Sequence, residues 1–336
     1  MTFNYPPILN TKDGSVRRVG FEIEFAEVSL DQVANSIIGL YGGSIQVYNK
    51  FYQKITNTSL GDFSLQIDAR VLTEKSYEKI WNKAGLRPEE LTSRRRNINK
   101  NLENTLDSIA SLVVPYEIST PPVPIDELPR LEPLRNALFQ IKAKGTSSSF
   151  LYAFATHINP ELPVCDTKTI LSYTRAFLLL YHWLSEKSAV NITRKLTAFI
   201  NPFPDEYFSL VLDQNYNPTF EKFANDYYFF NPDRNRPLDL YPVLAFIDKD
   251  KVDTFNDLGK VSARPTLHYR VPNSLIDDPT WSLAKEWNLW VMVEQLANSP
   301  TDIENLSREY LMLRKDTVIR FKRKWINKIE TWMDAK

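Results

Sequence analysis

Two glutamates near the start of the chain, Glu22 and Glu24, are separated by one residue and flanked by Phe21 and Phe25. Side chains alternate along a β-strand, so both carboxylates would lie on one face and the apolar side chains on the other. Aligned carboxylates repel each other. A divalent cation such as Mg²⁺, which takes oxygen ligands, would relieve that repulsion. The pattern therefore predicts a metal site or, alternatively, an ordinary strand with a polar, half-solvated outer face.

Three later segments repeat this spacing of reactive residues at positions i and i+2. They are the pairs Glu117 and Ser119, His157 and Asn159, and His268 and Arg270. A single histidine or arginine on a strand is more commonly a structural residue that forms a hydrogen bond or an ion pair. The repetition across four segments instead favours one sheet with an apolar back and a polar front that collects carboxylates, imidazoles and a guanidinium.

The residue types on that front indicate metal-assisted chemistry at phosphate. Three carboxylates can hold one or two Mg²⁺ ions, and His157 joins them or binds substrate. Arg270 suits an anionic group such as phosphate, which guanidinium binds through two parallel hydrogen bonds. Metal and arginine together are typical of phosphoryl transfer. The sequence has no Cys-x-x-Cys or His-Glu-x-x-His motif for zinc and no glycine-rich nucleotide loop.

The elements that must position these residues mix short strands with long helices. Strands are expected over 18–25, 45–47, 63–72, 112–118, 151–158 and 265–272. Helices are expected over 30–40, with Ser29 as the cap, over 125–142, and within 167–230, 279–298 and 302–333. This order lacks regular βαβ alternation, so it predicts an α+β fold around a mainly antiparallel sheet, with a helix-rich C-terminal half.

Composition narrows the class of protein. The 336 residues carry 41 Lys+Arg and 41 Asp+Glu, a balance that argues against a general nucleic-acid binder. The apolar runs are too short for a membrane helix, and Met1–Gly20 lacks the apolar region of a secretory signal. With Cys165 as the sole cysteine, we expect a cytoplasmic protein without an internal disulfide. The charged run Arg94–Arg96 is expected to be solvated surface or a docking site for an acidic partner or a phosphate.

Four motifs, taken in order, resemble those of the putative amidoligase family. They are Val19–Phe25, Tyr116–Pro122, Thr156–Pro160 and Tyr269-Arg270. This family belongs to the carboxylate-amine ligases related to glutamine synthetase and glutamate-cysteine ligase. The motifs are short, and it is their ordered set that is specific.

The resemblance implies one domain over 1–336 with a curved, glutamine-synthetase-like sheet, a helical insertion or subdomain at 166–260, and C-terminal helices at 279–336 packed on the sheet. It also implies ATP and Mg²⁺: ATP would phosphorylate a carboxylate, and an amine would attack the acyl phosphate to form an amide. Small molecules, peptides and proteins are all open as the carboxylate and amine partners, and the oligomeric state is open too.

The same resemblance implies roles for individual residues. The metal ligands would be Glu22, Glu24 and Glu117, with Glu24 also catalytic. His157 would bind metal or nucleotide phosphate, and Arg270 would stabilise the transferring phosphoryl group. Nucleotide contacts would include His268 and Asn159, with Asn159 a candidate for substrate or phosphate contact, while Asp68 and Ser119 would face the acceptor substrate. His268 departs from the acidic residue that family members often carry there. Two alternatives stay open: an inactive binding or structural protein on this scaffold, and another metal-dependent phosphotransferase or hydrolase.

Overall fold

The computed structural model describes residues 2–49, 51–67, 115–148, 154–188, 201–256, 258–259, 261–316 and 320–335. Asp68 and the Arg94–Arg96 run lie outside the described residues, as do 112–114 and 151–153 at the starts of two expected strands. The expectations for these positions stay predictions.

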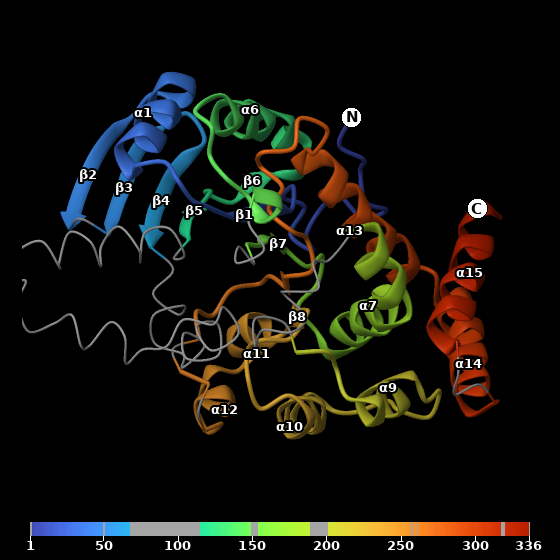
Figure 1. Ribbon diagram of the computed structural model, residues 1–336. Coiled ribbons are helices and arrows are strands. Elements are labelled where there is room, and N and C mark those ends of the chain that lie inside the picture. The colour runs from blue at the N-terminus through green and yellow to red at the C-terminus, as the bar shows by residue number, and fades with distance from the viewer. Residues whose placement is uncertain are drawn as a thin grey trace, which may run out of the picture.

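A single antiparallel sheet forms the centre of the molecule (Figure 1). Its strands are β1 (Arg18–Phe25), β2 (Ser44–Asn49), β3 (Tyr52–Thr58), β4 (Gly61–Ile67), β5 (Tyr116–Ser119), β6 (Val123–Pro124), β7 (Thr156–Pro160), β8 (Leu238–Asp239) and β9 (His268–Tyr269). They are ordered β2-β3-β4-β5-β1-β7-β9-β8, with β6 paired to one end of β1. This arrangement confirms the predicted α+β fold with a mainly antiparallel sheet.

Helices pack against the sheet and dominate the second half of the chain, while β2 lies at an outer edge (Figure 1). They are α1 (Leu30–Tyr41), α6 (Glu132–Gln140), α7 (Thr167–Lys187), α9 (Asp205–Leu212), α10 (Phe220–Phe230), α11 (Tyr241–Ile247), α12 (Lys249–Asp253), α13 (Leu283–Ala297), α14 (Pro300–Asp316) and α15 (Phe321–Asp334). Among the described helices, none combines the length and the apolar character that crossing a membrane requires.

Local sequence signals explain most element ends. Ser29 caps α1 as predicted, since its side chain accepts from the backbone N–H of Gln32 while the Gln32 side chain accepts from Ser29. The single helix expected over 125–142 is instead a 3₁₀ helix, Ile125–Leu131, followed by α6. Pro129 inside the first part lacks an N–H to donate, which disfavours a continuous α-helix.

Two strands differ from the expected set. β3 was not predicted, because polar residues occupy most of Tyr52–Thr58 and leave no clear alternation of hydrophobic side chains. The last strand is much shorter than 265–272, since only His268–Tyr269 forms a ladder, although isolated bridges at Thr266 and Asn273 continue the pairing on either side. β9 depends on β7, which is distant in sequence, whereas β3 pairs with the strands that directly precede and follow it.

The back of the sheet is the hydrophobic core. Phe21, Ile23 and Phe25 of β1 are fully buried, as the alternation predicted. Tyr269 on β9 contacts both Phe177 of α7 and Trp290 of α13. Helices α7 and α13 therefore cover the half of the sheet that carries β7 and β9, whereas α1 packs on β3 and β4.

The C-terminal helices α14 and α15 pack against α7 rather than against the strands (Figure 1). Phe321, Trp325 and Ile329 are buried along one face of α15, and the Trp325 indole N–H donates to the carbonyl oxygen of Leu179. This helical stripe is a packing seam, as its spacing predicted. The span 166–260 contains β8, which pairs with β9 at the edge of the sheet. The proposed division into subdomains stays a prediction.

Candidate active site

Strand pairing brings three of the four predicted motifs into register on the front of the sheet. β1 lies between β5 and β7. Glu22 is opposite Ser119 on one side and His157 on the other, and Glu24 is opposite Glu117. Neighbouring positions in register point to the same face. Antiparallel pairing thus makes one polar surface from β1 and two strands that follow it by more than 90 residues in the sequence.

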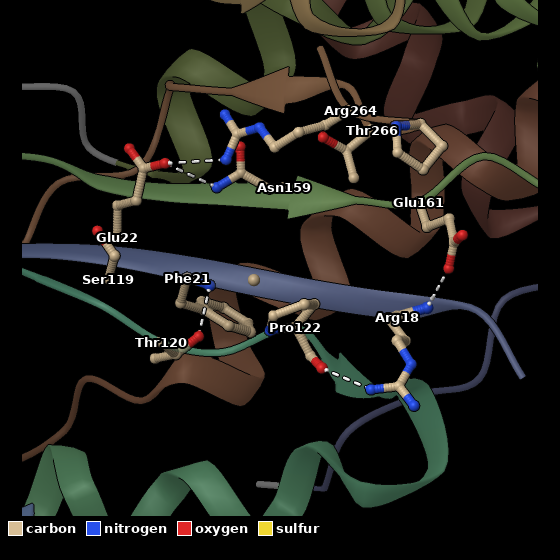
Figure 2. Close-up of a pocket in the computed structure, with 12 residues that line it drawn as sticks. Arg18, Phe21, Glu22, Ser119, Thr120, Pro122, Asn159, Glu161, Arg264 and Thr266 are labelled. Carbon is tan, nitrogen blue, oxygen red and sulfur yellow. Dashed lines mark hydrogen bonds and ion pairs between the residues drawn. The ribbon is translucent and has the colours of Figure 1, made fainter. Parts of the chain in front are cut away.

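A cavity of about 370 Å³ opens on this front, at the N-terminal end of β1 (Figure 2). It is lined by Arg18, Gly20, Phe21, Glu22, Ser119, Thr120, Pro122, Asn159, Glu161, Arg264, Pro265 and Thr266. Asn159 donates to Glu22 Oε1 at 3.0 Å, and the Arg264 guanidinium lies 3.8 Å from the same oxygen. Glu22 therefore marks the boundary between this cavity and the rest of the polar front.

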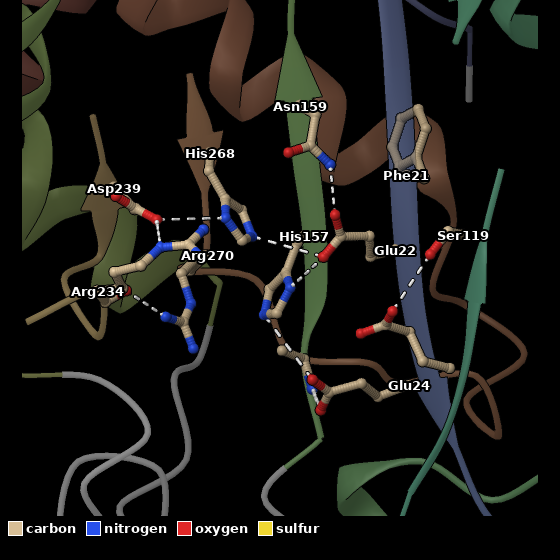
Figure 3. A network of polar contacts seen from close by, with 12 residues as sticks. Phe21, Glu22, Glu24, Ser119, His157, Asn159, Arg234, Asp239, His268 and Arg270 are labelled. Atoms are coloured by element: carbon tan, nitrogen blue, oxygen red, sulfur yellow. Dashed lines mark hydrogen bonds and ion pairs between the residues drawn. The ribbon is translucent and has the colours of Figure 1, made fainter. Parts of the chain in front are cut away.

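The Glu22 carboxylate is the centre of a network that continues away from the cavity (Figure 3). Its Oε2 lies 3.1 Å from His157 Nδ1 and 3.6 Å from His268 Nε2. Burial opposes ionisation of this group, but the neighbouring His268 and His157, together with Arg264, hold the Glu22 pKa well below its ordinary value. Glu22 is ionised at neutral pH and available as a metal ligand.

His157 lies between Glu22 and Glu24. Its Nδ1 faces Glu22, and its Nε2 lies 3.9 Å from Glu24 Oε1. Burial lowers the His157 pKa well below the ordinary value, and this effect outweighs the hydrogen bond with Glu22. The imidazole is therefore neutral at pH 7 and keeps a nitrogen lone pair that can bind a metal.

Glu24 and Glu117 form the second carboxylate pair of the front, and both are buried. Glu24 Oε2 accepts from the backbone N–H of Ala155 at 2.7 Å. Glu117 Oε1 accepts from the Gln66 amide at 2.9 Å and from the Ser119 hydroxyl at 3.2 Å. These donors fix the carboxylates in place, and Ser119 acts here as a support for Glu117 as well as a lining residue of the cavity.

His268 is held from the neighbouring strand β8 by Asp239, its partner in register, which the sequence patterns did not single out. Asp239 Oδ2 lies 3.8 Å from His268 Nδ1 and 3.1 Å from Arg234 Nε (Figure 3). Burial disfavours the Asp239 carboxylate, but His268 and Arg234 outweigh it and lower the pKa. Burial also lowers the His268 pKa. Asp239 lies between Leu238 and Leu240 and is five positions from Arg234, but no reactive residue stands two positions away, so the i, i+2 pattern did not select it.

Arg270 lies on the same front, next to the two histidines (Figure 3). Its Nη1 donates to the Arg234 carbonyl oxygen at 2.6 Å and to Asn235 Oδ1 at 3.2 Å. Its positive charge contributes to the lowered pKa values of His157 and His268. The backbone of the segment before β8 thus orients this guanidinium, an arrangement that sequence spacing could not reveal.

The potential metal ligands fall into two groups that share His157. One group is Glu24, Glu117 and His157, and the other is Glu22, His157 and His268. Within each group the ligand atoms lie within 4.8 Å of one another. The three glutamates therefore share a face, but Glu22 groups with imidazoles rather than with the other two carboxylates.

Every predicted site residue in the described part of the chain lies on this front. Asp68 is not among the described residues. The sequence did not identify Arg264, Asp239, Arg234 or Gln66 as partners in the site.

No curated protein and no solved structure matches the chain. A family description does match: residues 15–292 fit that of the putative amidoligase enzymes, a span that contains all four motifs. The chain is therefore a member of the putative amidoligase family.

Proposed function

We propose that this protein is an ATP-dependent carboxylate-amine ligase that uses Mg²⁺ and proceeds through an acyl phosphate. Membership of the putative amidoligase family supports the reaction class. The main support is the pair of potential metal-ligand groups that share His157 on the polar front of the sheet. A ligase of this class needs a place to neutralise phosphate charge beside a place to hold a carboxylate.

The donor set fits the proposed metal. Glu24 and Glu117 offer carboxylate oxygens, which Mg²⁺ prefers, and their other oxygens are oriented by donors from Ala155 and Gln66. The neutral His157 can complete this group without adding positive charge. Glu22 with two imidazoles suits a transition-metal ion such as Mn²⁺ better than Mg²⁺. Bound divalent ions would supply charge neutralisation at phosphate oxygens.

The remaining residues of the front would bind and orient the reactants. Arg270 is held by the Arg234 carbonyl oxygen and the Asn235 amide oxygen, so its positive charge has a fixed place on the front and suits a phosphoryl group. His268 is proposed to contact the nucleotide, and Asn159 is proposed to contact the substrate or a phosphate group. Ser119 is proposed to contact the acceptor substrate, as is Asp68. We propose a cytoplasmic location, with small-molecule, peptide or protein carboxylates and amines as partners.

Calorimetry with Mg²⁺ and ATP tests the binding step, and ADP release with a carboxylate and an amine tests turnover. We expect ADP to form in a 1:1 ratio with an amide detected by mass spectrometry. Glu24→Gln should bind Mg²⁺ weakly and lose turnover while keeping its fold. A folded wild-type protein that binds no Mg²⁺ and ATP would contradict the proposal and would favour an inactive binding protein on this scaffold.

One observation favours a second candidate, a metal-dependent hydrolase or phosphotransferase. Two histidines and one carboxylate, as in Glu22, His157 and His268, are a common ligand set for transition-metal enzymes. Product analysis separates the candidates. A hydrolase would turn over its substrate with Mn²⁺ or Zn²⁺ and no nucleotide, and a phosphotransferase would yield a stable phosphorylated product instead of an amide.

A further inference from the structure

The cavity beside Glu22 contains buried polar atoms whose hydrogen-bonding capacity is not used. Asn159 Oδ1, Arg264 Nε and Thr266 Oγ1 have no hydrogen-bond partner among the described residues. All three residues line the cavity (Figure 2). Asn159 is only 4% exposed. Because buried polar groups are rarely left unpaired, three such atoms around one cavity indicate a ligand that completes them.

The unpaired atoms differ in character, and this difference restricts the ligand. Arg264 Nε is a charged donor, and Thr266 Oγ1 can donate beside it. Asn159 Oδ1 is an acceptor, because the Asn159 amide nitrogen is already directed at Glu22. A carboxylate would satisfy Arg264 and Thr266, whereas an ammonium group would satisfy Asn159.

The charges of the lining point to the same ligand. The lining contains two arginines, Arg18 and Arg264, and two glutamates, Glu22 and Glu161. A ligand with a single charge would leave an opposite charge of the wall uncompensated, which is unfavourable in a partly buried site. A zwitterion keeps the balance, and about 370 Å³ is enough space for a small ligand or the end of a peptide.

Gly20 creates the space. It is on the front of β1 between Arg18 and Glu22, and it pairs with Asn159 in register. A Cβ atom built at Gly20 would meet Asn159 Cβ and the Thr120 carbonyl oxygen at 3.9 Å, which is ordinary contact. Its backbone φ is not in the left-handed region, so other residues could adopt this conformation. The backbone geometry therefore does not require glycine, and its lack of a side chain leaves the cavity open.

We propose that this cavity binds a substrate through a zwitterionic amino-carboxylate group, as found in a free α-amino acid. The substrate carboxylate pairs with Arg264 and Thr266, and its ammonium group with Asn159 and Glu161. This inference rests on the proposed ligase function, for which it names one substrate class. It assigns binding roles to Arg264, Thr266 and Gly20.

The direct test is calorimetry on the full-length protein without nucleotide. The ligands are alanine, leucine, glutamate and lysine, each beside its N-acetyl and carboxamide forms. At least one free amino acid should bind, and blocking either charged group should weaken its binding by about tenfold or more. The proposal is overturned if no amino acid binds, or if the blocked forms bind as tightly as the free ones.

Variants connect the binding to this cavity. Gly20→Val projects a side chain into it and should weaken amino-acid binding by about tenfold or more, and Gly20→Ala should have a smaller effect in the same direction. The matched control is Gly39→Ala in α1, where a Cβ meets nothing within 4 Å and binding should be unchanged. Unchanged binding in folded Gly20→Val, or in Gly20→Ala if the valine variant does not fold, overturns the proposal.

Arg264→Gln provides a readout that a purely structural role would not move. This variant should bind the free amino acid and its carboxamide about equally, because the partner of the carboxylate is gone. A retained preference for the free acid would count against the assignment. Parallel titration with Mg²⁺ and ATP separates the two proposals. Nucleotide binding without amino-acid binding contradicts only this inference. Amino-acid binding without nucleotide binding contradicts only the ligase proposal.

Discussion

Two buried ionic clusters in this protein are built in opposite ways. Behind the sheet, Arg17 and Glu294 of α13 form two parallel hydrogen bonds of 2.7 Å, with both side chains fully buried. Tyr173 and Trp290 donate to the same carboxylate. On the front, by contrast, the imidazole of His268 lies 3.6 Å from the Glu22 carboxylate.

The difference separates a structural cluster from one that is suited to bind something. Arg17 also donates to the carbonyl oxygens of Ile8 and Glu161, so its donors and the Glu294 oxygens are occupied. Spacings of 3.6 to 3.9 Å on the front are too long for hydrogen bonds and leave room for an ion between ligand atoms. Burial alone therefore does not distinguish the two clusters, whereas the distances between their charged groups do.

The largest expected effect is on stability, at the cluster behind the sheet. Glu294→Gln leaves the Arg17 charge buried without its carboxylate and should lower the free energy of unfolding by about 3–5 kcal/mol. Denaturant titration measures it. Asp253→Asn, at the exposed pair of Lys249 and Asp253, is the control and should change stability by less than about 0.5 kcal/mol. A small loss in Glu294→Gln would mean that the two clusters are not different in kind.

On the front, the main effect should be on metal binding rather than on folding. Glu24→Gln keeps an acceptor for the Ala155 N–H but removes the charge, so Mg²⁺ affinity should fall by about 100-fold or more, equivalent to about 2.7 kcal/mol. The free energy of unfolding should change by less than about 1 kcal/mol, since burying an amide costs less than burying a carboxylate. Calorimetry with Mg²⁺ and denaturant titration measure the two quantities. The opposite outcome, lost stability with metal affinity intact, would make the front a structural cluster.

The pH dependence of stability should come from the histidines of the front. The pKa values of His157 and His268 are lowered in the folded state, chiefly by burial. Below about pH 6.5 the unfolded chain takes up protons that the folded protein does not. The free energy of unfolding therefore decreases as the pH is lowered, by about 1.4 kcal/mol per pH unit for each histidine. The lowered pKa of Glu22 has the other sign: its contribution is present above about pH 4.3 and is lost only as the pH falls through the folded value.

Unfolding titrations between about pH 5 and pH 7 isolate the histidine contribution. His157→Asn and His268→Asn should each reduce the slope by about half. Slopes that match the wild type in both variants would show that the two imidazoles are not held neutral.

The smallest expected effect is at Asp239, which contacts His268 from the neighbouring strand β8. Asp239→Asn keeps the size of the side chain but weakens its hold on the imidazole, so affinity for Mn²⁺ should fall by about tenfold. Calorimetry with Mn²⁺ measures it, and Asp239→Glu should recover part of the loss. If Asp239→Asn binds Mn²⁺ as tightly as the wild type, Asp239 does not contribute to metal binding.

Local patterns in the sequence predicted most of what lies on the front. The i, i+2 pairs placed Glu22, Glu24, Glu117, His157 and His268 on one face because alternation is a property of a single strand. The same rule placed their apolar neighbours in the core. β3 escaped prediction, since its polar sequence forms a strand only through pairing with β2 and β4. The buried pair of Arg17 and Glu294 escaped too, because 277 positions separate the partners.

By itself, the sequence determined which face of each strand is reactive, where α1 begins, and to which family the chain belongs. Only the tertiary structure decided that Glu22 groups with two imidazoles while Glu24 groups with Glu117. It also brought Arg264 from a loop to the cavity beside Gly20. The physical reason is that alternation is a local property of the backbone, whereas distances between side chains depend on the register and packing of segments far apart in the chain.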